Sequence, residues 1–228
     1  IDVPINSLSL FDQKYVKKTL SEIDPFGVNL ENKEKDPAPE LKVVAPELPD
    51  DFPKDVVSDT IPWLKRLKEK PLEYRFDDFI SGEKITQENL KGKYVYVYTG
   101  TVSPTIGRSF TELKLLHAKY SSKGFTIISI LSQPYSSRYS DNENFKSDRK
   151  IEEFIGKNVK DYGVDWVVSY SDKRPNPLAK KFSRNTSLKW LIGPDGKLIH
   201  SNISNSRYRT TDENTLPLTE ALEKIFGK

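Results

Sequence analysis

Cysteine is absent from this chain of 228 residues, and so is methionine. A chain without cysteine forms no disulfide bond and no thiolate metal site. It also has no thiol that could serve as a nucleophile or as a redox group. The missing cysteines do not indicate a compartment, because such a chain is compatible with reducing and oxidising surroundings alike.

Long hydrophobic runs are also missing. No stretch approaches the roughly 18 apolar residues that cross a bilayer, so we expect no membrane span. The sequence shows neither the apolar segment of a secretory signal nor an arginine-rich presequence. The chain begins at Ile1 and not at methionine, which we interpret as removal of a leader or of another N-terminal segment.

Neither sign of charge dominates, since 36 lysines and arginines face 33 aspartates and glutamates, for a net charge of +3. Nucleic-acid binding usually needs basic residues clustered on one face, so no nucleic-acid partner is predicted. The basic run 65–70 is typical of the solvated face of a helix. The two histidines lie far apart in the sequence and no glycine-rich phosphate loop follows a strand, so we predict no metal and no cofactor.

Residues 1–71 are predicted to form an N-terminal extension. Short helices are expected at 10–20 and 61–70, with 58–60 offering an N-cap to the second. The proline-rich stretch between them removes backbone donors and favours extended structure over helix or sheet. Composition alone favours a disordered linker, but we interpret the segment as an interaction arm, because an extended chain can cover much of a partner's surface.

Residues 72–228 are predicted to form one α/β domain, in which apolar, β-branched and aromatic runs alternate with helical periodicity. Trp63, Trp166 and Trp190 lie among aliphatic neighbours and are expected in the core. The order of elements implies a mixed central sheet with parallel strands, flanked by helices and closed by a hairpin. Strands are expected at 94–98, 125–131, 164–168, 189–192 and 197–200, and helices at 109–120, 151–159 and 216–226.

Four segments in order resemble motifs of the thioredoxin superfamily, in particular its TlpA-like and glutathione peroxidase-like branch. The first leads into a predicted strand, and the second begins the helix that follows the active-site loop in that family. The third connects the end of this helix to the next strand, and the fourth is a hairpin near the C-terminus. These segments are 83–97, 109–113, 119–128 and 191–199. The resemblance covers about residues 74–227 and implies a thioredoxin-like fold.

The resemblance also places the family's chemical positions. There a thiolate lies at the turn from the first strand into the helix, whose N-terminus lowers its pKa. Ser103 falls where the attacking cysteine would be, Ile106 on the resolving cysteine and Ser187 on the cis-proline. The Trp-Asn pair of peroxidases falls on 185–186, which is Asn-Thr. We therefore expect three vestigial positions and no enzyme.

Ser103 could still act as a nucleophile of another kind, which would make the chain a hydrolase. A serine hydroxyl needs a general base within reach and usually an oriented third group. We expect His117 on the surface of a helix or partly packed, and His200 at a strand end facing solvent. Ser103 is instead interpreted as a cap of the helix that follows it.

The function predicted from these features is that of a non-catalytic pseudoenzyme, a structural or accessory subunit of a larger protein complex. Its partner subunits would be contacted through the N-terminal extension. A processed N-terminus and an isoelectric point of 8.8 suit a mitochondrial complex. The alternative is a free-standing periplasmic or secreted module that binds a peptide or ligand near Ser103, Thr105 and Ser187.

Overall fold

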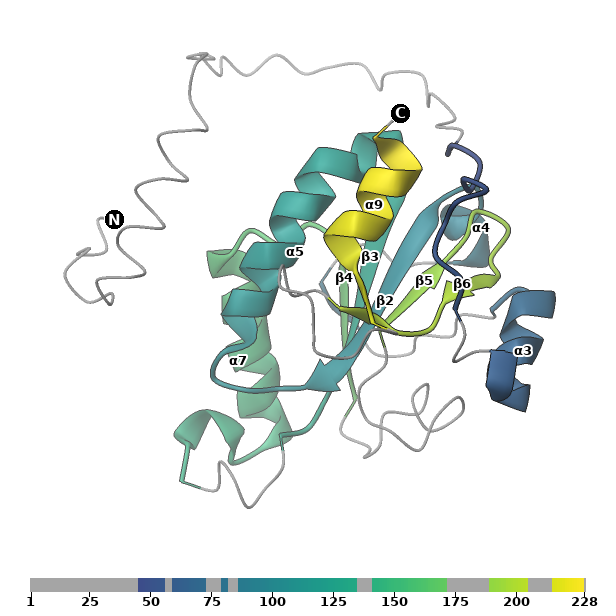
Figure 1. Ribbon diagram of the computed structural model, residues 1–228. Helices are drawn as coiled ribbons and strands as arrows, with labels where there is room; N and C mark the ends of the chain where they lie inside the picture. The colour runs from purple at the N-terminus through teal and green to yellow at the C-terminus, as the bar shows by residue number, and fades with distance from the viewer. Residues whose placement is uncertain are drawn as a thin grey trace, which may run out of the picture. The chain divides into compact units, whose positions relative to one another are not determined.

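A computed structural model describes residues 45–55, 59–72, 79–81, 86–134, 141–171, 189–204 and 215–227 (Figure 1). All of them belong to one compact unit, Lys42–Lys228. The helix expected at 10–20 and the first 44 residues of the predicted extension 1–71 lie outside the described residues, as does the side chain of Trp63.

A six-stranded sheet forms the centre of the described part, in the order β1-β4-β3-β2-β5-β6. Strands β2, β3 and β4 run parallel, whereas β1 and β5 are antiparallel to their neighbours and β6 returns from β5 as a hairpin. The bounds are β1 Phe79–Ser81, β2 Tyr94–Thr101, β3 Phe125–Ser132, β4 Val167–Ser171, β5 Lys189–Ile192 and β6 Leu198–His200. A separate pair joins β7 Ile203–Ser204 to β8 Leu216–Pro217.

The central strands are buried on both faces, as their composition predicts. β2 and β3 consist largely of β-branched and aromatic residues, and nearly every position is buried. Alternate residues of β2 enter two different clusters: Tyr94 and Tyr96 join one, Val95 and Val97 the other. The sheet therefore separates two apolar layers, as a sheet covered by helices on both faces requires.

Helices cover both layers (Figure 1). The first cluster takes buried residues from α5 Ile106–Tyr120, α7 Asp148–Asp161 and α9 Leu218–Phe226. The second takes Leu64 from α3 Pro62–Glu69 and Leu90 from α4 Gln87–Leu90. Short 3-10 turns lie at η2 Ser121–Lys123 and η3 Glu143–Phe145. None of the helices among the described residues is long and apolar enough to cross a membrane.

This arrangement confirms the thioredoxin-like α/β fold that the sequence predicts. It has the βαβ unit β2-α5-β3, the antiparallel hairpin β5-β6 and the closing helix α9. Trp166 and Trp190 are buried, as expected. Some bounds differ from the prediction: α5 begins three residues before Ser109, and β4 spans Val167–Ser171 and not 164–168.

Residues 45–55, here called the strap, form neither helix nor strand, as their prolines predict. Phe52 is buried in the first cluster, and the Tyr94 hydroxyl donates to the backbone oxygen of Pro46 at 2.9 Å. The backbone N–H of Ser201 donates to the Asp55 carboxylate at 2.6 Å, and Lys224 pairs with Asp51 at 3.1 Å. The strap is therefore packed against the sheet domain that follows it.

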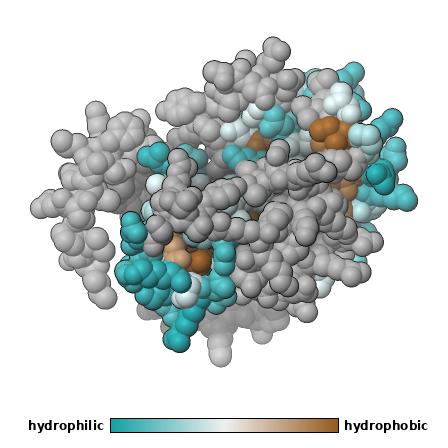
Figure 2. Space-filling model, turned by 90° about the horizontal axis from the view of Figure 1, so that it is seen from below, coloured by the Kyte–Doolittle hydropathy of each residue, from teal (hydrophilic) through white to brown (hydrophobic). Residues whose placement is uncertain are grey.

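Seen from below (Figure 2), the apolar residues of the described part gather only in small separate areas. Leu48 of the strap, 42% exposed, and Tyr162, 39% exposed, are the large hydrophobic side chains that stand out among the described residues.

Candidate functional site

The turn between β2 and α5 is the place where the family resemblance puts the attacking thiolate. Ser103 is partly exposed and Thr105 is exposed, and their hydroxyl oxygens lie 3.2 Å apart in a hydrogen bond. The backbone N–H of Ile106 donates to the carbonyl of Ser103 at 3.1 Å, which starts the helix. The turn thus presents two hydroxyl groups beside the N-terminus of a 15-residue helix.

Ser103 does not cap α5 in the way that the sequence predicts. The N-cap is Thr105, with φ of −99° and ψ of 12°, and no side chain forms a cap hydrogen bond there. The Ser103 hydroxyl bonds to Thr105 and not to a free N–H of the first turn. The residue between them, Pro104, is exposed, so the turn is open to solvent.

Ile106, which the family resemblance aligns with the resolving cysteine, belongs to the core. Its side chain is 3% exposed and packs in the first cluster with Val102 and Phe110. The next residue, Gly107, lies against the ring of Tyr162, since a Cβ at residue 107 would be only 2.3 Å from that ring. The first turn of α5 is therefore filled by packing on the side of Ile106 and Gly107. Ser187 and residues 185–186 lie outside the described residues.

Neither histidine is placed as the sequence predicts. His117 is buried, with its Nδ1 2.8 Å from a carboxylate oxygen of Asp165 and its ring against Trp166. His200 is 2% exposed and does not face solvent; its Nδ1 accepts from the backbone N–H of Asn202 at 3.2 Å. Burial lowers the pKa of His200, an effect partly offset by the negative charge of Asp55.

Both histidines are therefore packed inside the domain. His117 lies on the buried side of α5, and His200 is a buried residue of β6. The hydrogen bonds found for their ring nitrogens go to Asp165 and Asn202, and not to the hydroxyl of Ser103. Within the described part of the chain, no three His, Asp or Glu side chains come together in a group that could hold a metal ion.

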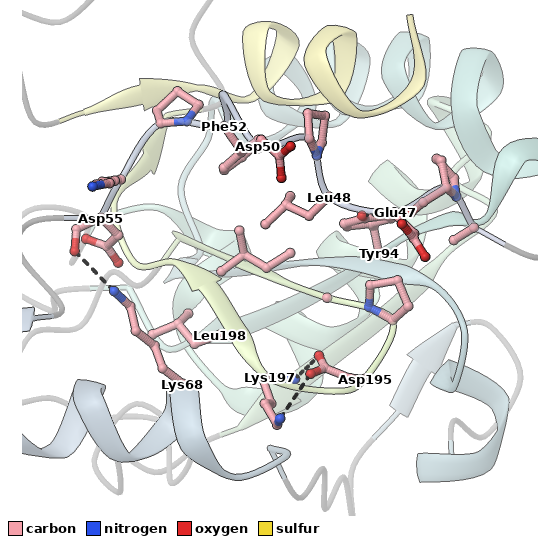
Figure 3. Close-up of a pocket in the computed structure, with 18 of the residues that line it drawn as sticks. Glu47, Leu48, Asp50, Phe52, Asp55, Lys68, Tyr94, Asp195, Lys197 and Leu198 are labelled. Atoms are coloured by element: carbon pink, nitrogen blue, oxygen red, sulfur yellow. Dashed lines mark hydrogen bonds and ion pairs between the residues drawn. The ribbon is translucent and has the colours of Figure 1, made fainter. Parts of the chain in front are cut away.

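A hollow of about 720 Å³, here called the strap groove, lies between the strap and the β5–β6 hairpin (Figure 3). Strap residues form one side, and Tyr94, Lys68 and the hairpin form the rest. Ser103 and Thr105 are not part of its lining. The lining comprises Ala45, Pro46, Glu47, Leu48, Pro49, Asp50, Phe52, Pro53, Lys54, Asp55, Asp59, Lys68, Tyr94, Gly193, Pro194, Asp195, Lys197, Leu198 and Ile199.

The groove cannot be predicted from the sequence, because the strap and the hairpin that form its two sides are more than a hundred residues apart along the chain. The ends of the strap are tied down by the bonds of Pro46 and Asp55 described above. Burial raises the pKa of Tyr94 to about 12, and the negative charges of Asp195 and Glu47 add to the effect. The carboxylates of Asp195 and Glu47 thus lie near the Tyr94 hydroxyl, beside the groove.

No family model and no curated protein matches the sequence. Among solved structures, a thiol-disulfide isomerase from Corynebacterium glutamicum is similar at 15% identity and a TM-score of 0.46, over 63% of this chain and 88% of that chain. A DsbF homologue from Corynebacterium diphtheriae is similar at 12% identity and a TM-score of 0.42, over 57% and 74%. An uncharacterized conserved protein from Geobacillus kaustophilus shares 18% identity, with a TM-score of 0.43, over 66% and 76%.

The fold assignment rests on the order and direction of the strands and helices of this chain. They define a thioredoxin-like fold, here in a chain without cysteine. The turn before α5 therefore contains no thiol that could act as a nucleophile or a redox group.

Proposed function

We propose that this chain is a non-catalytic thioredoxin-fold protein, an accessory subunit of a larger protein complex. One observation carries the proposal: the strand-turn-helix that holds a thiolate in the family is kept, whereas the chain has no cysteine. A chain with this fold and without thiol chemistry can still provide a rigid surface to which other proteins bind.

The surroundings of Ser103 support this proposal over a hydrolase. A serine nucleophile needs a base that takes its proton, usually a histidine held by a third group. His117 is buried and bonded to Asp165, and His200 to Asn202. The Ser103 hydroxyl is bonded instead to Thr105, whose hydroxyl is too weak a base for this role.

We further propose a mitochondrial location for the complex, supported by the isoelectric point of 8.8. Fractionation of cells that produce the native protein, with an antibody against this chain, tests this part separately. Recovery of the chain outside the organelle would overturn the mitochondrial location. It would not affect the proposed subunit role, which is tested separately.

The subunit role is tested by native electrophoresis and size-exclusion chromatography of a gentle extract from the native source. We expect the chain to migrate well above the 26.2 kDa of the monomer. Recovery as a lone monomer under mild conditions would overturn the proposal. So would a hydrolase activity of the purified chain that Ser103→Ala abolishes.

A further inference from the structure

The strap groove lies between two segments of backbone. One is the strap, which is neither helix nor strand and turns at 50–51, and the other is the turn and return strand of the β5–β6 hairpin. The groove volume of about 720 Å³ falls in the range of about 300–1,000 Å³ typical of small-molecule pockets, so it has room for side chains of an occupant. Figure 3 shows Glu47 and Asp50 on the strap side, and Lys68, Asp195 and Lys197 across from them.

Apolar surface lies exposed inside this groove. Leu48 is 42% exposed, although large hydrophobic side chains are rarely this open in the described residues. Ile199 of β6 is partly buried and also lines the hollow, next to the buried Leu198. An apolar side chain seated between Leu48 and Ile199 would remove this surface from water, a gain of about 25 cal/mol per Å².

The charges of the groove are unequal. Five carboxylates line it, against three lysines. Asp59 pairs with Lys68 at 2.7 Å, Asp195 pairs with Lys197 at 3.3 Å, and Asp55 accepts from the backbone of Ser201. Among the groove residues, Glu47 and Asp50 on the strap have no ion-pair partner in the described part, and Lys54 is the remaining amine without one.

The charge that remains on the strap side is negative, because Glu47 and Asp50 outnumber Lys54. A cation that enters the groove would meet Glu47 and Asp50, whereas an anion would be repelled. Since the groove combines an apolar centre with acidic edges, its occupant should combine an apolar side chain with basic flanks.

We propose that the strap groove binds an extended basic segment of a partner subunit, with one large apolar side chain between Leu48 and Ile199 and lysine or arginine beside Glu47 and Asp50. This inference rests on the proposed function and adds to it the place and the chemistry of one contact. A second copy of this chain, an acidic segment and a small anion are the competing occupants.

Binding is tested first with the full-length purified chain and a fluorescein-labelled nonapeptide that carries arginines around a central leucine and proline. The matched peptide has glutamate in place of each arginine. Fluorescence anisotropy is expected to show at least tenfold tighter binding of the basic peptide, weakening as salt increases. Equal affinity for the two peptides, or tighter binding of the acidic one, would overturn the inference.

Two double variants separate the groove from the overall charge of the protein. The variant Glu47→Gln/Asp50→Asn removes the two carboxylates of the strap, and we expect at least fivefold weaker binding of the basic peptide. The control Glu152→Gln/Asp161→Asn removes the same charge from exposed positions of α7, and affinity should not change. Equal losses in both variants would show general attraction and refute a groove site.

The absence of cysteine allows a direct test within the native complex. The variant Leu48→Cys carries one thiol, which can be labelled with a thiol-directed photo-crosslinker; Tyr162→Cys is the control at the other exposed large hydrophobic residue. After irradiation, we expect a cross-linked partner peptide from residue 48 with net positive charge and an apolar residue, and not from residue 162. An acidic partner peptide, or a second copy of this chain, would overturn the inference.

The two proposals fail in distinguishable ways. If the chain migrates in a complex but residue 48 gives no cross-link, the groove inference falls and the subunit role stands. If the chain is a monomer in the native extract, the subunit role falls, and with it the partner that the groove inference names.

Discussion

At the scale of single residues, a thiol placed at Ser103 tests whether the N-terminus of α5 acts on that position. A thiol beside a helix N-terminus has a lowered pKa, because the free N–H groups stabilise the thiolate. We expect Ser103→Cys to give a thiol about half a unit to one unit below the usual value of about 8.5. The matched variant Ser122→Cys, just past the other end of the helix, should titrate at or above it.

The measurement is the pH dependence of the rate of alkylation by iodoacetamide. If the thiol at residue 103 titrates no lower than the thiol at residue 122, the N-terminus of α5 does not act on residue 103. Thiol–disulfide exchange is not expected from Ser103→Cys alone, because Ile106 is buried where the resolving thiol would be.

The buried His200 should make the stability of the protein decrease as the pH falls. Its pKa in the folded protein lies below the 6.5 of an unperturbed histidine because of burial, offset in part by Asp55 and reinforced by Lys68. Between the two pKa values the unfolded chain binds more protons than the folded one, so stability is full above about pH 6.5 and is lost as the pH falls below it. The slope from one proton is at most about 1.4 kcal/mol per pH unit.

Urea unfolding between pH 7.5 and 5.5 measures this slope. We expect His200→Gln to flatten it, whatever the variant does to stability at pH 7.5. An unchanged slope would mean that His200 does not carry the linkage in this range.

At the scale of elements, α7 contains a glycine at a position where a larger side chain would fit. Gly156 lies inside the helix, and apart from its chain neighbours and the backbone of the same helix, a Cβ there would meet no heavy atom within 4 Å. Alanine limits the unfolded chain more than glycine does, so Gly156→Ala should raise the free energy of unfolding by about 0.5–1 kcal/mol. Gly107→Ala in α5 is the contrast, since its Cβ must displace the ring of Tyr162 and should gain less. Urea midpoints with unchanged m-values check both; equal gains would contradict the packing of Tyr162.

The elements that the sequence predicts well are those decided by local pattern. β2, β3 and β5 have apolar runs, and α9 has a clear apolar face, so their types and places are confirmed. β4 is displaced by about three residues because pairing with β3, which begins at Ile128 opposite Val167, selects the register and the local sequence does not. The position of Ser103 likewise follows from motif order, since it is tied to a strand and a helix that the pattern reveals.

What the sequence does not reveal is contact between distant segments. The burial of His200 depends on cover from elsewhere in the fold, and the strap groove needs residues of the strap and the hairpin together. Asp55 and Ser201 are 146 residues apart in the sequence, and no local signal connects them. The proline-rich composition of the strap favours a free linker, whereas Phe52 and Asp55 fix it to the domain.

At the scale of the whole molecule, the question is whether the strap unfolds with the sheet domain. Phe52 is 8% exposed and belongs to the cluster that holds α5, α7 and α9. Truncation of a buried phenylalanine costs about 3–5 kcal/mol, so Phe52→Ala should lower the stability of the entire domain by about 3 kcal/mol. Leu48→Ala, at an exposed position of the same strap, should change it by less than about 0.5 kcal/mol.

Far-ultraviolet circular dichroism and tryptophan fluorescence, followed in the same urea titration, measure the effect. Trp166 and Trp190 are buried in the sheet domain, one in each apolar cluster, so their emission reports the domain and not the strap. We expect both signals to shift together to lower urea in Phe52→Ala, because strap and domain share one core. A variant with an unshifted transition would show that the strap is an independent arm, and the groove that it helps to form would then have only one fixed side.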